Sequence, residues 1–284
     1  MTHAASPVSA RLPALLLCLA AAGWLAGCAG TPRATADGTP VSSVGAARGN
    51  PELYTAVDEP EARQRARVRL ELAAGYYEQG QFMVALDEVK RSLAADPTFG
   101  PAYNLRGLIH RQINEPALAE ADFREALRRQ PRDADAMHNL GVFYCDAGRF
   151  ADANALFARA VEVPNYTNVS NSWMMLGICQ ARAGNQEEAR RSLARSFELD
   201  AGNPITTFNL ALLLHQAGEH TRAQFYIRRL NNSELANAQS LWLGMQVEHA
   251  LNNREVVRQL ADQLRRRFPE SPEWANYQRS GLRG

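Results

Sequence analysis

The sequence predicts an all-α protein built from about six helix-turn-helix units stacked in a row. Three observations support this. A turn-forming residue follows an apolar helical segment roughly every 34 positions, at Gly80, Asn114, Gly148, Gly184 and Gly218. A small residue comes five positions after each turn, at Ala85, Ala119, Ala153, Ala189 and Ala223. Pro97 and Pro131 end the first two units at the same phase.

Near its start the chain has an apolar stretch over residues 15–22, which follows Arg11. The stretch is followed closely by Leu25-Ala26-Gly27-Cys28. A stretch of this length is typical of a secretory signal peptide and is too short to span a bilayer. Its end resembles the lipobox of bacterial lipoprotein precursors. That resemblance implies a signal over 1–27, a lipid on Cys28 and, because Ala29 is not Asp, sorting to the outer membrane. The alternatives are an ordinary cleaved signal or a buried helix.

Residues 28–60 are rich in Thr, Pro, Gly, Ala and Ser and show no apolar periodicity. This composition is typical of a flexible tether. We therefore expect the lipidated tether to carry a folded repeat domain over 61–284.

The phase of the pattern places the units at 66–99, 100–133, 134–169, 170–203, 204–236 and 237–268. The third unit is two residues longer, and the extra length falls near residues 164–167. The sixth is degenerate, with Asn252 and Asn253 where a turn glycine is expected.

The pattern resembles the tetratricopeptide repeat, a helix-turn-helix unit of about 34 residues. Small residues let the two helices of a unit approach closely, and a turn glycine accepts positive φ. Each unit buries its apolar face only against a neighbour, so the resemblance implies a superhelix. The alternative is an unrelated helical bundle.

Other classes of protein find little support. A net charge of +1 argues against a nucleic-acid binder. The sequence contains no His-Glu-x-x-His motif, nucleophile elbow or Gly-rich phosphate loop, so we expect neither an enzyme nor a cofactor. His138, Cys145 and Cys179 are a weak candidate for a metal site, because no close Cys or His pair stands among them. We expect His110 and His138 on helix surfaces.

Cys145 and Cys179 lie 34 residues apart, on the first helices of neighbouring units. The longer third unit shifts them off identical repeat positions. A disulfide needs Cα atoms within roughly 7 Å, which adjacent helices reach where they pack closely. We predict the disulfide; two inert buried thiols are the alternative.

The first helices of such an array line its concave face, which is the expected partner groove. Its side chains mix apolar surface with a few polar groups, which favours a docked amphipathic helix or extended segment. The predicted groove residues are Leu70, Ala74, Tyr77, Asn104, Leu108, Arg111, His138, Val142, Asn171, Met174, Ile178, Phe208, Leu212 and His215. Some of them, notably Leu70 and Leu212, could instead pack between helices.

Several segments also resemble the type IV pilus biogenesis lipoproteins of the PilW/PilF kind. They are residues 139–148 (NLGVFYCDAG), 209–214 (NLALLL), 223–226 (AQFY), 238–244 (AQSLWLG), 264–269 (LRRRFP) and 271–273 (SPE). Some members of that family carry the cysteine pair and others lack it.

The resemblance implies a pilotin, a monomer held at the periplasmic face of the outer membrane. It would bind subunits of the pilus secretin and promote their assembly into the multimeric pore. The alternatives are a repeat scaffold of the outer-membrane β-barrel assembly machinery, a component of a tight-adherence pilus system, or an adaptor for a periplasmic protease or cell-wall enzyme.

Overall fold

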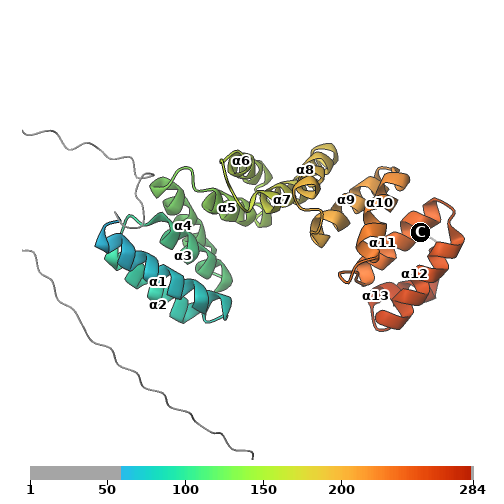
Figure 1. The fold of residues 1–284 in the computed structure, drawn as a ribbon, viewed down its shortest axis with the longest axis horizontal. Coiled ribbons are helices and arrows are strands. Elements are labelled where there is room, and N and C mark those ends of the chain that lie inside the picture. Colours follow the sequence, from blue (N-terminus) through green and yellow to red (C-terminus); the bar gives the residue numbers. More distant parts are fainter. Residues whose placement is uncertain (1–58, 283–284) are drawn as a thin grey trace, which may run out of the picture. The chain divides into compact units, whose positions relative to one another are not determined.

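A computed structural model describes residues 59–282, which form thirteen α-helices and no strand (Figure 1). The first six helices are α1 (Glu61–Glu78), α2 (Phe82–Ala95), α3 (Gly100–Gln112), α4 (Pro116–Arg129), α5 (Ala134–Asp146) and α6 (Phe150–Val161). The others are α7 (Val169–Arg182), α8 (Gln186–Leu199), α9 (Pro204–Gln216), α10 (His220–Asn231), α11 (Ala238–Ala250), α12 (Arg254–Arg267) and α13 (Pro272–Ser280). The predicted signal peptide, Cys28 and nearly all of the predicted tether lie outside the described residues.

The helices pack in consecutive pairs. Each odd-numbered helix from α1 to α11 packs on the even-numbered helix after it, and also on the next odd-numbered helix. The first helices of successive units therefore lie side by side and form one continuous row (Figure 1). The predicted array of six helix-turn-helix units is confirmed.

The turns within the units occur where the sequence predicts them. The residue that closes each turn has positive φ, including the two asparagines that replace glycine, Asn114 (61°) and Asn252 (60°). Asparagine is among the few residues that tolerate this conformation. Asn165 also has φ of 60°, within the extra length of the third unit.

Small residues bring the paired helices into close contact. The five alanines that follow the turns are completely buried. On the facing helices, a Cβ added to Gly107 would lie 2.7 Å from the Phe123 ring, and one added to Gly141 would lie 2.9 Å from the Phe157 ring. Because interiors are packed as densely as organic crystals, these glycines set the distance between the helices.

Two boundaries differ from the prediction. Helix α1 begins at Glu61, ahead of the expected start near residue 66. Helix α13 lies beyond the six predicted pairs and packs on α11 and α12, where Trp274 and Tyr277 cover the cluster that contains Leu241 and Met245. The sixth pair therefore does not end the array. A segment of nine residues was too short to show a helical period in the sequence.

The close helix contact predicts opposite effects for two glycine substitutions. Gly141→Ala should lower the free energy of unfolding by about 1–2 kcal/mol, because the Phe157 ring is buried and cannot yield to a new Cβ. Gly75→Ala in α1 meets no atom within 4 Å and should raise stability by up to about 1 kcal/mol through helix propensity. Urea unfolding of the two variants measures both changes, and equal effects would contradict the packing account.

Candidate functional site

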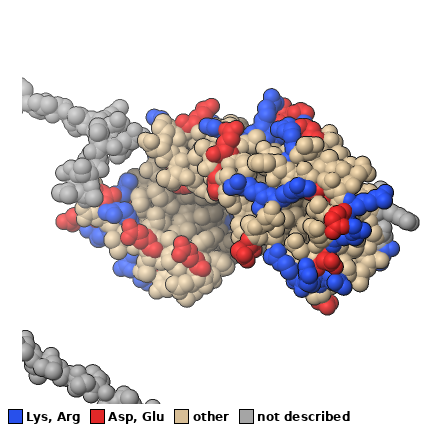
Figure 2. Space-filling model, turned by 45° about the vertical axis from the view of Figure 1, so that its right-hand side comes forward, with Lys and Arg blue, Asp and Glu red and all other residues tan. Residues whose placement is uncertain are grey.

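Almost all of the predicted groove residues lie on the row of first helices, with side chains at least partly exposed to solvent. Leu70, Leu108, Val142 and Ile178 are half-buried, and each packs one side against the core while the other meets solvent. Tyr77, Asn104 and His138 are also half-buried, and Arg111 is exposed. Leu70 and Leu212 thus pack between helices in part. On the face shown in Figure 2 a hollowed region is largely uncharged, and charged side chains are interspersed around it.

Met174 needs a correction. Its side chain is 8% exposed and belongs to the core cluster of Leu193 and Leu210, so it offers little surface to a partner. Met174 stands at the same distance before its turn residue as His138 and Phe208, which are half-buried, so the repeat phase gives no sign of its burial.

Polar side chains connect neighbouring first helices along this face. Gln112 Nε2 donates to the Tyr77 hydroxyl at 3.2 Å, and Asn139 Nδ2 donates to Asn104 Oδ1 at 3.1 Å. These contacts restrain side chains that would otherwise be free to rotate. The face is therefore partly ordered before any partner arrives, which lowers the entropy lost on binding.

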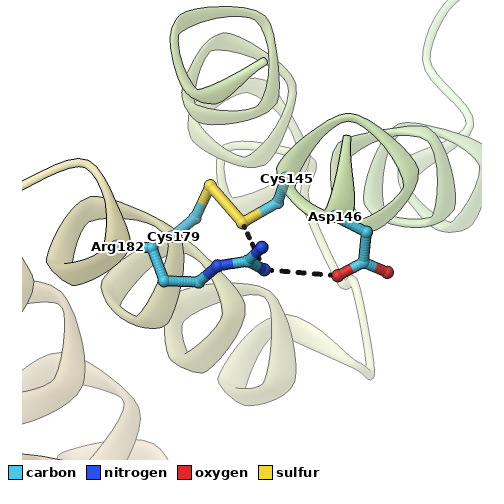
Figure 3. Close-up of a disulfide and its surroundings, with 4 residues drawn as sticks. All are labelled: Cys145, Asp146, Cys179 and Arg182. Atoms are coloured by element: carbon cyan, nitrogen blue, oxygen red, sulfur yellow. Dashed lines mark hydrogen bonds and ion pairs between the residues drawn. A yellow bond between two sulfur atoms is a disulfide. The ribbon is translucent and has the colours of Figure 1, made fainter. Parts of the chain in front are cut away.

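Asp146, at the end of α5, forms ion pairs with two arginines, one from each neighbouring unit. Arg182 Nη1 of α7 lies 3.3 Å from Asp146 Oδ1 (Figure 3). Arg111 Nη2 of α3 lies 2.8 Å from Asp146 Oδ2. One carboxylate thus connects three units. All three side chains are substantially exposed, so each pair adds about 0–1 kcal/mol to stability. Two arginines around one carboxylate leave this stretch of the face with excess positive charge.

The two cysteines lie directly beside this cluster. Cys145 and Cys179 are both fully buried, and in the structure their sulfur atoms are bonded and their Cα atoms are 5.8 Å apart (Figure 3). Arg182 Nη1 lies 3.7 Å from the Cys145 sulfur. The geometry suits the predicted bridge. Formation of the bond in the protein as the cell makes it stays a prediction.

His138 connects α5 to α7. Its Nδ1 lies 2.8 Å from Ser172 Oγ, and its ring meets the Phe157 ring edge-on. Burial lowers the pKa of His138, while nearby Asp135 acts in the opposite direction. Ser172 is completely buried, so its hydroxyl is closed to a substrate and the pair acts as a structural hydrogen bond.

His110 does not lie on a helix surface, which corrects the sequence prediction. Its side chain is buried, with Nδ1 2.8 Å from Asp122 Oδ2. Arg106 Nη2 reaches the same carboxylate at 2.6 Å. A buried carboxylate needs such partners, since an unpaired one would be expensive.

The candidate metal site does not assemble. Cys145 and Cys179 are bonded to each other, and His138 faces Ser172. Within residues 59–282 no group of three or more His, Cys, Asp or Glu side chains could hold a metal ion. None of the described helices is long and apolar enough to cross a membrane.

Sequence reasoning missed Asn139, Asp146 and Ser172, which are partners of predicted groove residues, and Arg182, the second partner of Asp146. Their signal is the spacing of 34 to 36 residues between the members of each pair.

Comparison with known proteins agrees with this architecture. Two models of the tetratricopeptide repeat match residues 70–134 and 132–201. With the paired helices described above, they make the chain an all-α tetratricopeptide-repeat protein.

The chain is homologous to the type IV pilus assembly protein PilF of Pseudomonas aeruginosa. The two are 25% identical over 209 residues, which cover 74% of this chain and 83% of PilF. The solved structure of PilF has a TM-score of 0.71 at 24% identity, over 77% of this chain and 99% of that one. The structure of PilW, described as a widely conserved type IV pilus biogenesis factor, has a TM-score of 0.68 at 27% identity, over 76% and 99%.

The cysteine pair generates a prediction about stability. A bridge that closes a loop of 34 residues should stabilise the fold by about 2–4 kcal/mol, because it restricts the unfolded chain. Reductant should lower the urea midpoint of the wild-type chain and leave that of the Cys145→Ala/Cys179→Ala double variant unchanged. The intact mass of unreduced protein, purified from the periplasm, shows whether the bond is present. Free thiols at both positions would contradict the prediction.

Proposed function

We propose that this chain is a pilotin for a type IV pilus: a monomeric outer-membrane lipoprotein that binds secretin subunits and promotes their assembly into the multimeric pore. Homology to PilF, together with the likeness to PilW, supports a role in type IV pilus biogenesis. The part played by the secretin is our extension of that role.

The observation that carries the proposal is the face formed by the first helices. It presents half-buried apolar side chains at regular intervals, and polar contacts between neighbouring helices restrain it. Such a surface suits an amphipathic helix or an extended peptide, which it would hold without chemical change. The protein would act as a scaffold and not as an enzyme.

The amino-terminal sequence supports the location. A lipid on Cys28 would contribute about 0.8 kcal/mol for each buried methylene, and more than one acyl chain makes attachment stable. The tether would then concentrate the groove near secretin subunits at the same membrane, which raises their effective concentration.

Substitutions on α1 and α3 test the groove. Tyr77→Glu combined with Leu108→Glu should abolish binding of the purified secretin to the full chain, because two carboxylates would have to be buried in an apolar contact. The matched control is Leu118→Glu on α4, which changes an exposed leucine outside the predicted groove. Binding is measured by pull-down, and circular dichroism monitors helicity.

Loss of binding in the double variant, with unchanged helicity and normal binding by Leu118→Glu, supports the proposal. Normal binding by a folded double variant would place the secretin site elsewhere. If instead wild-type chain retains β-barrel assembly components or a periplasmic hydrolase and no secretin, the corresponding alternative replaces the pilotin.

A further inference from the structure

The outer side of α1 has no helix packed on it among residues 59–282. Each later first helix packs on the second helix of the unit before it, as α3 does on α2 and α9 does on α8. Helix α1 is the first helix in the described part of the chain, so it has no such neighbour there. The side of α1 that a preceding unit would cover is therefore left open.

Val68 belongs to this open side by its place in the repeat. It lies twelve positions before the turn residue Gly80. In the later units the same position is completely buried, at Ala102, Ala136, Ser172, Thr206 and Ser240. Thr206 shows what buries it, because its Oγ1 lies 2.9 Å from Ser196 Oγ of α8, the second helix of the preceding unit. Val68, in contrast, is 61% exposed.

Leu72 repeats the observation one turn further along α1. It lies eight positions before Gly80, and the third to fifth units have buried leucines at that position, Leu140, Leu176 and Leu210. Leu72 is 43% exposed. Residues four apart are neighbours on the surface of a helix, so Val68 and Leu72 form one apolar row on the open side of α1.

The other end of the array is covered by the chain itself. Helix α13 packs on α11 and α12, where Trp274 and Tyr277 cover the last core cluster. A unit in a repeat array buries its apolar surface only against a neighbour, so both ends of the array need such a cover. The segment that immediately precedes α1 is the nearest one for the open side.

The chain enters α1 at the end of the apolar row. The Glu59 carbonyl accepts a hydrogen bond from Gln64 Nε2 at 2.9 Å, and Arg67 Nη2 lies 2.9 Å from Glu59 Oε2. Gln64 lies four positions before Val68 and continues the same row. Residue 59 is therefore held beside α1, where the row begins.

Residues 54–58 lie outside the described residues, and their sequence is Tyr-Thr-Ala-Val-Asp. Tyr54 precedes Glu59 by five residues, which an extended chain spans over about 17 Å. The row from Gln64 to Leu72 is only about 12 Å long, at 1.5 Å for each helical residue. The segment is therefore long enough to follow the whole row.

The segment also matches the row in chemistry. Tyr54 and Val57 bring two large apolar side chains, and Asp58 brings a negative charge. Arg65 and Arg69 line the same open hollow on α1 as Val68, so positive charge borders the apolar row. An apolar and acidic segment suits a surface of this kind better than a basic one would.

We propose that residues 54–58 run back along α1 and pack Tyr54 and Val57 on Val68 and Leu72, with Asp58 near Arg65. The segment takes the place of the second helix of a preceding unit and closes this end of the array. The tether from Cys28 then ends at residue 53 and meets the repeats on the side of α1 that faces away from the second unit.

Photo-crosslinking in the full chain tests this contact. The photoreactive amino acid p-benzoylphenylalanine replaces Tyr54, the cells are irradiated, and mass spectrometry of proteolytic fragments maps the crosslinks. We expect an intramolecular crosslink from residue 54 to the part of α1 that contains Val68 and Leu72. The same probe in place of Val41, earlier in the tether, should give far less crosslink to α1.

Leu72→Glu should reduce the yield of the crosslink about tenfold, because the segment would have to bury a carboxylate. Leu118→Glu on α4 is the matched control, since Leu118 is exposed to a similar extent and lies outside the row, and its yield should equal that of the wild type. Circular dichroism checks that both variants fold. Val57→Glu gives a second test that leaves the repeats unchanged, and it should lower the yield in the same way.

Crosslinks between two copies of this chain, or to another protein, would assign the open side of α1 to that occupant and overturn the proposal. The proposal is equally overturned if residue 54 crosslinks elsewhere in the repeats or nowhere, or if Leu72→Glu and Val57→Glu leave the yield unchanged. No readout involves the secretin, so the outcome is independent of the proposed function.

Discussion

The close approach of the two helices in each unit is the constraint on which the rest of the structure depends. It requires alanine after the turn, and in the middle units glycine on the facing helix, because a larger side chain would meet a buried ring or leucine. Two helices alone cannot bury all of their apolar surface, so each pair must pack on the next pair. The row of first helices, and with it the partner-binding face, follows from that stacking.

The middle of the row is where separate units are connected most strongly. Asp146 connects α3, α5 and α7 through Arg111 and Arg182. The Cys145–Cys179 bond lies beside Asp146 and Arg182 (Figure 3). Neighbouring units in a repeat array contact only each other, so their relative angle depends on such local connections. Restraints at this junction would preserve the curvature of the face that a partner meets.

Much of the fold could be predicted from the sequence, because the turns and the close helix contacts require particular residue types at fixed positions of each repeat. The turn positions, including Asn114 and Asn252, and the buried alanines followed directly from the period. The cysteine pair was predicted from its spacing of 34 residues, but the polar pairs across units were not, because many residues share that spacing and only the packed helices show which side chains meet. Met174 and His110 were misplaced because the burial of one side chain depends on the neighbours that it meets, and the repeat pattern does not give those neighbours. Helix α13 was missed because its segment is short.

The most direct test of the account is the secretin multimer in outer-membrane fractions of a strain that lacks this protein, resolved on a gel without harsh denaturation. The account predicts that the multimer disappears while secretin monomer persists, and that the wild-type protein restores it. A multimer of normal abundance in the deletion strain would contradict the account, because the groove would then serve a different partner.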